Sequence, residues 1–205
     1  HAHWNIRCGT GSGKKDGMRL LKINKVREGR YLKNYELVYE NRAGHEKKYE
    51  IVSHHEIRDI SELGDRVSGV SIVAVHEGKM LLLREFRMGV DRFVYNLCAG
   101  MKEAEETLEE CIRRELYEET GLSLKRIYKI LNPAFAAVSI CDIQNQIAFV
   151  EAEGEIEDFH MSENEWIQAA FYTKEEMASL LETEQFSTRA QIASWFFSIG
   201  GLDNL

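Results

Sequence analysis

Residues 100–122 form a strongly acidic stretch that holds eight glutamates and constrains the fold more than any other part of the chain. Assigning about 100° of rotation to each residue predicts an α-helix over residues 105–120. Its apolar stripe consists of Leu108, Cys111, Ile112 and Leu116. Glu115 and Glu119 project from the C-terminal end of the same stripe, with Glu118 beside them. We therefore expect these carboxylates to lie where the buried face of the helix ends.

Glutamates this close together repel one another unless something positive lies between them. Each like-charge pair at i,i+3 or i,i+4 costs an exposed helix about 0.2–0.5 kcal/mol, and the repulsion grows as water is excluded. A cluster of oxygen ligands suits Mg²⁺ or Mn²⁺ better than zinc, and Mg²⁺ commonly combines one or two carboxylates with water and substrate phosphates. The alternative is a solvated acidic helix with internal ion pairs, Glu109 with Arg113 and Glu110 with Arg114.

The spacing of the stretch resembles the Nudix box, which reads Gly, five residues, Glu, seven residues, Arg-Glu-apolar-any-Glu-Glu-any-Gly-apolar. All nine fixed positions match over 23 residues. They are Gly100, Glu106, Arg114, Glu115, Leu116, Glu118, Glu119, Gly121 and Leu122. The resemblance implies a loop-helix-loop that binds a divalent metal ion and hydrolyses a nucleoside diphosphate linked to another moiety. Gly121 is placed to end the helix in the left-handed conformation.

Within the Nudix hydrolase superfamily the chain looks most like the ADP-ribose pyrophosphatase branch. Residues 81–100, LLLREFRMGVDRFVYNLCAG, follow that branch's apolar strand, its Gln/Glu-aromatic-Arg motif and its Leu-Pro-Ala-Gly approach to the box. Two positions depart from the pattern. Cys98 replaces the usual proline, and Ile143 stands where a downstream loop often has a glutamate. Reaction type is therefore better supported than substrate identity.

The resemblance implies roles for particular residues. Glu115 and Glu119 match the principal metal ligands, Glu118 a further ligand, and the carbonyl of Ala99 a backbone ligand. Arg114 matches the arginine that orients a glutamate of the box. Arg87 matches a substrate-binding arginine, and Arg84 is a second candidate for that role. The general base would be Glu163, Glu165 or Glu119. A solvated acidic turn is the alternative reading of Glu163 and Glu165.

Composition agrees with an enzyme of this kind. The chain has 205 residues, is 44% hydrophobic and carries a formal charge of −8, so there is no basic footprint for nucleic acid or an anionic membrane. No apolar run approaches the length of a membrane span and no signal peptide is evident, so we expect a cytoplasmic protein. The four cysteines lack metal-ligand spacing, and Cys98 and Cys111 are interpreted as small buried residues.

We expect three regions along the chain. Residues 1–17 have no hydrophobic period and are interpreted as a leader or cloning remnant; residues 18–60 form a small antiparallel β-sheet, with strands at 19–27, 31–40 and 47–53. Residues 65–205 form the catalytic domain, an α/β/α sandwich with a mixed sheet. In the branch that it resembles, the N-terminal sheet is exchanged or packed between subunits, which implies a homodimer.

The pattern of the catalytic region predicts its elements. Strands are expected at 67–75, 79–86, 93–97, 127–131, 144–151 and 166–172. After the helix of the box, a capping box of Thr173 and Glu176 opens a helix to about residue 181, and Ser187 opens another to residue 199. On that last helix, Trp195, Phe196 and Ile199 are expected to face the core.

Three functions follow from these residues and the resemblance. The preferred one is hydrolysis of ADP-ribose, or a related nucleoside diphosphate sugar, to a nucleoside monophosphate and a sugar phosphate. The second is another Nudix substrate, such as an oxidised nucleoside triphosphate or a dinucleotide. The third is a non-catalytic Nudix domain that binds a nucleotide as a sensor.

Overall fold

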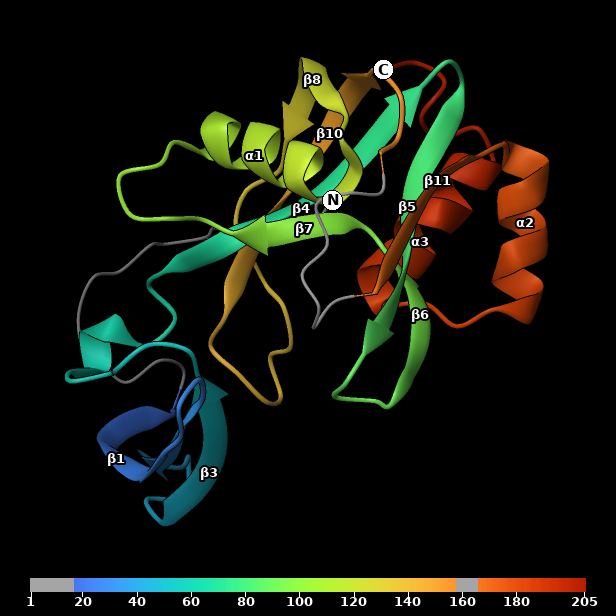
Figure 1. Cartoon of the computed structure of the whole chain (residues 1–205). Helices are drawn as coiled ribbons and strands as arrows, with labels where there is room; N and C mark the ends of the chain where they lie inside the picture. Colours follow the sequence, from blue (N-terminus) through green and yellow to red (C-terminus); the bar gives the residue numbers. More distant parts are fainter. Residues whose placement is uncertain (1–16, 158–165) are drawn as a thin grey trace. The chain divides into compact units, whose positions relative to one another are not determined.

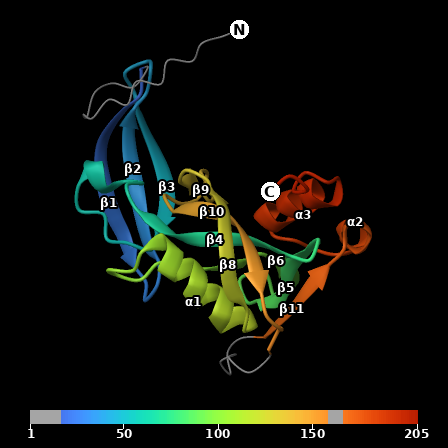
Figure 2. The ribbon, with the colours of Figure 1, turned by 90° about the horizontal axis from the view of Figure 1, so that it is seen from above.

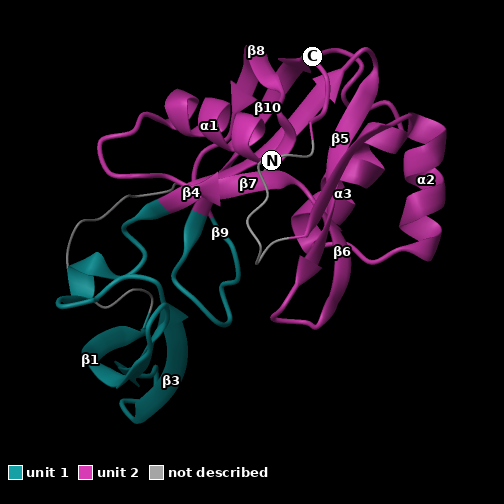
Figure 3. Ribbon diagram, in the orientation of Figure 1, with its two compact units in different colours: residues 1–67, 135–144 teal, residues 68–134, 145–205 magenta. Residues whose placement is uncertain are grey.

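A computed structural model describes residues 17–157 and 166–205 of the chain. The fold divides into two compact units (Figure 3). The first comprises residues 1–67 and 135–144, and the second comprises residues 68–134 and 145–205. The loop at 135–144 thus joins the first unit, although it is far from that unit in sequence. Residues 1–16 of the predicted leader lie outside the described residues, as do Glu163 and Glu165.

The first unit is built on a three-stranded antiparallel sheet in the order β1-β2-β3. The strands are β1 (Arg19–Glu28), β2 (Lys33–Glu40) and β3 (Glu46–Ser53), close to the predicted ranges, and a short 3-10 helix, η1 (Ile60–Glu62), follows. The β2–β3 turn is fixed by Asn41, whose Oδ1 accepts hydrogen bonds from the backbone N–H groups of Ala43 and His45. A small core gathers Tyr35, Leu37, Ile51 and Ile57.

The second unit is built on an eight-stranded mixed sheet whose main path runs β11-β5-β4-β10-β8. The strands are β4 (Val67–His76), β5 (Lys79–Arg87), β6 (Arg92–Asn96), β7 (Cys98–Met101), β8 (Ser123–Ile130), β9 (Ala134–Phe135), β10 (Gln144–Glu153) and β11 (Ile167–Tyr172). β6 pairs with β5, and β7 pairs with β4. The strand expected at 93–97 is confirmed as β6. Strand β7 was not expected, and it forms where the chain leaves β5 after Asn96 and pairs with β4.

Both faces of this sheet are buried, because alternate residues of its central strands point to opposite sides. Val70, Ile72 and Ala74 of β4 join the core on the side of α1 (Leu108–Thr120). Val73 between them joins the core on the side of α2 (Lys174–Thr183) and α3 (Thr188–Ser198). The helices cover the two faces in Figures 1 and 2. The predicted α/β/α sandwich is confirmed.

Capping side chains set where the helices begin. Helix α1 starts at Leu108 rather than near residue 105, because Thr107 is its N-cap and forms a reciprocal capping box with Glu110. The predicted capping box of Thr173 with Glu176 at the start of α2 is confirmed, as is the predicted N-cap of α3 at Ser187. Gly121 ends α1 with φ of 77°, as expected. No helix among the described residues is long and apolar enough to cross a membrane.

The predicted core face of α3 is wrong. Trp195, Phe196 and Ile199 are 57%, 41% and 60% exposed, whereas Phe197 is 2% exposed. The buried residues of the helix are Ala190, Ser194 and Phe197. Apolar side chains occur on both sides of this helix, so periodicity does not select a face. The small residues Ala190 and Ser194 allow the helix to approach the sheet closely, and Phe197 follows them inward.

This assignment of faces predicts unequal effects of two aromatic substitutions in α3. We expect Phe197→Ala to lower the free energy of unfolding by about 3–5 kcal/mol, because it leaves a cavity in the core. Trp195→Ala removes a larger side chain from an exposed position and should change that free energy by about 0.5 kcal/mol or less. Chemical denaturation of both variants measures the difference. A greater loss for Trp195→Ala would restore the face expected from the sequence.

Candidate functional site

A pocket of about 510 Å³ opens in the second unit where the end of β5, strand β7 and the C-terminal half of α1 meet. Three carboxylates and one arginine line it together. These residues are Glu85, Arg87, Glu115 and Glu119. The other lining residues are Phe86, Met88, Gly89, Ala99, Gly100, Met101, Trp166 and Ile167. The pocket therefore brings residues of the acidic stretch together with the arginine motif that precedes it.

Glu115 reaches the pocket by passing directly over Gly100, where a larger residue would have to displace its carboxylate. The Glu115 carboxylate lies against the backbone of Gly100, and a Cβ added there would come within 1.7 Å of the carboxylate carbon and of Oε1. Residue Glu115 is 8% exposed, and burial raises the pKa of its carboxyl group, although Arg114 opposes the shift. Gly100, the first glycine of the motif, is thus needed so that the Glu115 carboxylate can approach the backbone closely. The backbone conformation of Gly100 does not itself require glycine.

Glu119 lies one turn further along α1, on the same wall. Its Oε2 accepts a hydrogen bond of 3.0 Å from the backbone N–H of Ala99, and the thiol of Cys98 also donates to its carboxylate. Burial raises the pKa of Glu119 to about 8, against these two hydrogen bonds, and the neighbouring Glu115 and Glu85 raise it further. A buried carboxylate with so few donors is the kind of group that a cation stabilises.

Arg114 connects the two ends of the acidic motif. Its Nε and Nη2 donate to the two oxygens of Glu106 at 2.8 and 3.1 Å. Its Nη1 donates to Glu115 at 2.7 Å and to Glu118 at 3.1 Å, and Nη2 also donates to the carbonyl of Met101 at 2.9 Å. Arginine carries five N–H donors, so this side chain is fully used.

The expected ion pairs along α1 are only half correct. Arg113 pairs with Glu109 at 2.7 Å, as expected. Glu110 does not pair with Arg114, because its carboxylate instead accepts hydrogen bonds from the backbone N–H and hydroxyl groups of Thr107. That capping interaction frees Arg114 for Glu106, eight residues earlier in the chain.

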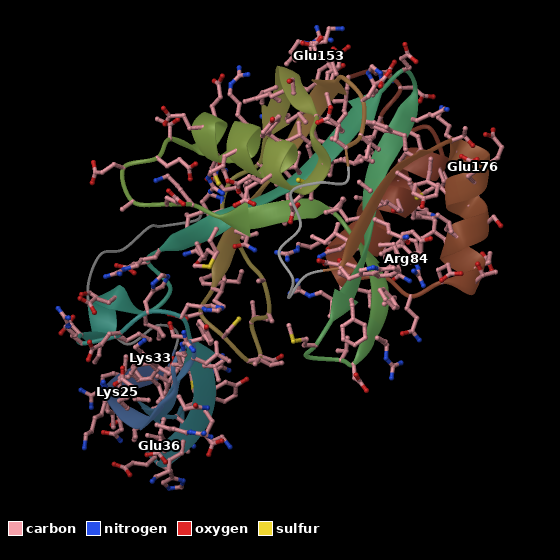
Figure 4. The ribbon with its side chains drawn as sticks, viewed as in Figure 1. Lys25, Lys33, Glu36, Arg84, Glu153 and Glu176 are labelled. Carbon is pink, nitrogen blue, oxygen red and sulfur yellow. The ribbon has the colours of Figure 1, made fainter. Side chains whose placement is uncertain are left out.

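Of the other site residues predicted from the sequence, some line the pocket and some do not. Glu118 has a side chain that is 55% exposed, bonds Arg114 and does not line the pocket, whereas Ala99 does. Arg87 lines the pocket and Arg84, labelled in Figure 4, does not. The guanidinium carbon of Arg84 lies 4.3 Å from the centroid of the Phe93 ring. The two arginines are three residues apart in β5, so they point to opposite faces of the sheet.

Sequence reasoning missed Glu85, which is 7% exposed and completes the acidic lining of the pocket. The signal was present, because Leu81 and Leu83 face the side of α1, and residue 85 continues the same alternation. A charged residue on that face near the box is a candidate for the site. Burial and the nearby charge of Arg87 also lower the pKa of Arg189 in α3.

The donor set fits a hard divalent ion that is completed by substrate. Within residues 17–157 and 166–205, no three His, Cys, Asp or Glu side chains gather into a cluster that holds a metal ion by itself. Glu115 and Glu119 nevertheless offer two carboxylates in one pocket, with Ala99 beside them, and Glu119 accepts a backbone hydrogen bond from Ala99. Mg²⁺ commonly takes one or two carboxylates and completes its shell with water and phosphate oxygens.

The close approach of Glu115 to Gly100 predicts a large effect of one added methyl group. Gly100→Ala should displace the Glu115 carboxylate by an ångström or more and lower kcat/KM by about 100-fold, because misplacement on that scale has such a cost. Steady-state kinetics with the substrate proposed for this site measures the loss. Gly44→Ala is the control: it strains a turn of the first unit at φ of 81° and should leave kcat/KM unchanged. Equal losses in both variants would contradict this account.

The pairing with Arg114 predicts how stability changes in acid. This arginine lowers the pKa of Glu106 to about 2, mainly through their hydrogen bonds. The contribution of the ionised carboxylate is fully present above its unfolded pKa, about 4.3, and is lost as pH falls through 2. The difference in unfolding free energy between wild type and Glu106→Gln should therefore be constant above about pH 5 and shrink below it. Denaturant titrations from pH 7 to 2.5 measure this difference, and a difference that grows in acid would refute the pairing.

Comparisons with known proteins agree on one family. The NUDIX domain model matches residues 65–196. The ADP-ribose pyrophosphatase of Bacillus subtilis (strain 168) is 28% identical over 130 residues, 60% of this chain and 68% of that protein. The GDP-mannose pyrophosphatase of Yersinia enterocolitica is 31% identical over 105 residues, 47% of this chain and 53% of that protein. The ADP-ribose pyrophosphatase of Saccharomyces cerevisiae is 25% identical over 171 residues, 78% of this chain and 72% of that protein.

A solved structure supports the fold over 95% of the chain. A crystal structure of an ADP compounds hydrolase superposes with a TM-score of 0.71 and covers 95% of this chain and 97% of its own. The two sequences are 20% identical, so the likeness is one of fold. The matched segment spans about half the length of the Yersinia relative.

Proposed function

The chain belongs to the NUDIX domain family, and we propose that it hydrolyses the pyrophosphate bond of a nucleoside diphosphate linked to another moiety in a reaction that requires a divalent metal ion. ADP-ribose is the proposed substrate, giving AMP and a sugar phosphate. The observation that carries the proposal is the pocket in which Glu115 and Glu119 face the same space as Arg87. Two carboxylates for a metal ion and a guanidinium for phosphate are what such a reaction needs.

Glu115 and Glu119 would hold Mg²⁺ or Mn²⁺, with Ala99 beside them, and Glu118 would contribute to a further ion. When bound, such an ion neutralises phosphoryl oxygens and lowers the pKa of a bound water. Arg87 binds the diphosphate, since its side chain is 59% exposed and lines the pocket. Arg114 holds Glu115 in position, and its single positive charge reduces the repulsion among Glu106, Glu115 and Glu118.

A carboxylate is also required to accept the proton of the attacking water. Glu119 is the candidate among the described residues, because its carboxylate lines the pocket beside Glu115 and Arg87. Glu165 and Glu163 remain the other candidates, and both lie outside the described residues. Glu119 is proposed first as a metal ligand, and the variant below removes that role together with any role as the base.

The choice of ADP-ribose rests on the relatives that bear this name in Bacillus subtilis and Saccharomyces cerevisiae. The GDP-mannose pyrophosphatase of Yersinia enterocolitica supports the wider class of nucleoside diphosphate sugars. A homodimer formed through the N-terminal sheet stays a prediction, as does activity on an oxidised nucleoside triphosphate or a dinucleotide.

A metal-dependent product assay tests the proposal. With Mg²⁺ present, the wild type should convert ADP-ribose to AMP, detected by chromatography, and a chelator should abolish the reaction. Glu119→Gln should lower kcat by about 10²- to 10⁴-fold, the range associated with loss of a general base. Glu109→Gln, on the exposed side of the same helix, is the matched control and should retain the wild-type rate.

Two results would contradict the proposal in different ways. If GDP-mannose, NAD⁺ or a nucleoside triphosphate is hydrolysed much faster than ADP-ribose, the reaction stands and the substrate changes. If wild type and Glu119→Gln hydrolyse nothing yet bind ADP-ribose equally well, the chain is a nucleotide sensor instead of an enzyme.

A further inference from the structure

A chain of hydrogen bonds runs through the second unit from the start of α3 to the pocket. The hydroxyl of Ser187, the N-cap of α3, donates to Oδ1 of Asn96 at 2.6 Å. Nδ2 of Asn96 donates to Oε1 of Glu85 at 2.6 Å, and Nη1 of Arg87 donates to Oε2 of Glu85 at 3.4 Å. Both oxygens of Glu85 are therefore engaged, one from the sheet and the other from the arginine.

Burial differs sharply along this chain. The side chain of Glu85 is 10% exposed, while that of Arg87 is 59% exposed. Glu85 and Arg87 lie two residues apart in β5 and point to the same side of the strand, toward the pocket. The carboxylate is thus a fixed anchor, and the guanidinium extends from it into open space. One of the five N–H donors of Arg87 is used by Glu85, which leaves others for a ligand.

Anchoring matters because a free arginine loses much conformational freedom when it binds. Ordering a long side chain costs about 0.5–1.5 kcal/mol, which corresponds to about 2- to 10-fold in affinity. An arginine that is already held by a buried carboxylate loses less. The Glu85 carboxylate is itself held in place, because Asn96 donates a hydrogen bond to it and Ser187 donates one to Asn96.

We propose that Glu85 is a positioning residue, which holds Arg87 in the orientation that binds the substrate diphosphate and is itself held by Asn96 and Ser187. The inference rests on the proposed function, because it takes the diphosphate to be the ligand of Arg87. It goes further in assigning a role to a buried acid outside the box, and in making substrate affinity depend on the N-terminus of α3.

Two other roles for Glu85 make different predictions. If Glu85 contacted the metal ion or accepted a proton, its loss would lower kcat and would act independently of Arg87. If it were only a structural residue, its loss would lower stability without changing affinity in the folded protein. A positioning residue acts through Arg87 alone.

A double-mutant cycle distinguishes these roles. Binding of ADP with Mg²⁺ is measured by calorimetry for wild type, Glu85→Gln, Arg87→Ala and the double variant, together with kcat and KM for ADP-ribose. Glu85→Gln should weaken ADP binding and raise KM by about 2- to 10-fold with little change in kcat. In the Arg87→Ala background, Glu85→Gln should have no further effect on either quantity. Glu153→Gln, an exposed glutamate of β10 labelled in Figure 4, should match the wild type throughout.

Asn96→Ala provides a second test that leaves the charge of Glu85 in place. It should weaken ADP binding in the same direction as Glu85→Gln, and its effect should likewise vanish when Arg87 is absent. If Glu85→Gln is too unstable to purify, the cycle is completed with Asn96→Ala. Thermal melting of each variant separates loss of fold from loss of affinity.

Each remaining outcome is decisive. An unchanged KM with a lowered kcat, or an equal effect of Glu85→Gln in both backgrounds, overturns the positioning role. So does an ADP affinity that does not change in Arg87→Ala. If the wild type hydrolyses nothing but binds ADP through Arg87, the proposed function fails, while the binding cycle still decides the role of Glu85.

Discussion

The organisation of the site depends on Arg114 and the carboxylates that surround it. This arginine uses all five of its N–H donors on Glu106, Glu115, Glu118 and one backbone carbonyl. The acidic helix would otherwise carry several like charges at close range, which destabilises a helix and becomes costlier near a buried wall. By bonding Glu106, which precedes α1, Arg114 also fixes the lead-in loop on the helix. A lysine, with a single charge centre, could not reproduce this fork.

The two-faced sheet explains why the pocket contains these residues and excludes others. Strand β5 buries Leu81 and Leu83 on the side of α1 and Met80 and Leu82 on the side of α2 and α3. Continuing that alternation places Glu85 and Arg87 at the pocket, whereas Arg84 is directed to the aromatic ring of Phe93. Helix α1 then approaches from the same side and brings Glu115 and Glu119. The pocket is thus a consequence of strand and helix periodicity meeting at one edge.

Much of this arrangement could be predicted from the sequence. The helical period placed Glu115 and Glu119 at the rim of the buried stripe. Thr173 and Ser187 marked the starts of α2 and α3, and Gly121 marked the end of α1. Family membership and the sandwich fold, both expected from the spacing of the box, are confirmed. The alternation of side chains along β5 also accounts for the separation of Arg87 from Arg84 and for the burial of Glu85.

Other features depend on packing that no local pattern encodes. The contact between Gly100 and Glu115 requires the loop to lie on the helix at one distance, and only the folded chain sets that distance. The buried face of α3 was mispredicted because Trp195, Phe196, Phe197 and Ile199 give apolar character to more than one side. Glu110 was assigned to Arg114 by helical spacing, but capping of Thr107 takes precedence at the first turn. In each case a tertiary or end-of-helix contact overrides a rule of spacing.

The central claim is that Glu115 and Glu119 hold a divalent cation against a bound diphosphate. Anomalous diffraction from crystals grown with Mn²⁺ and a non-hydrolysable ADP-ribose analogue tests it most directly. The account predicts an anomalous peak within about 2–2.5 Å of oxygens of both carboxylates and of a phosphate oxygen. A diphosphate bound in the pocket with no such peak, and with Glu115 and Glu119 bonded only to Arg114, Cys98 and the backbone of Ala99, would contradict it.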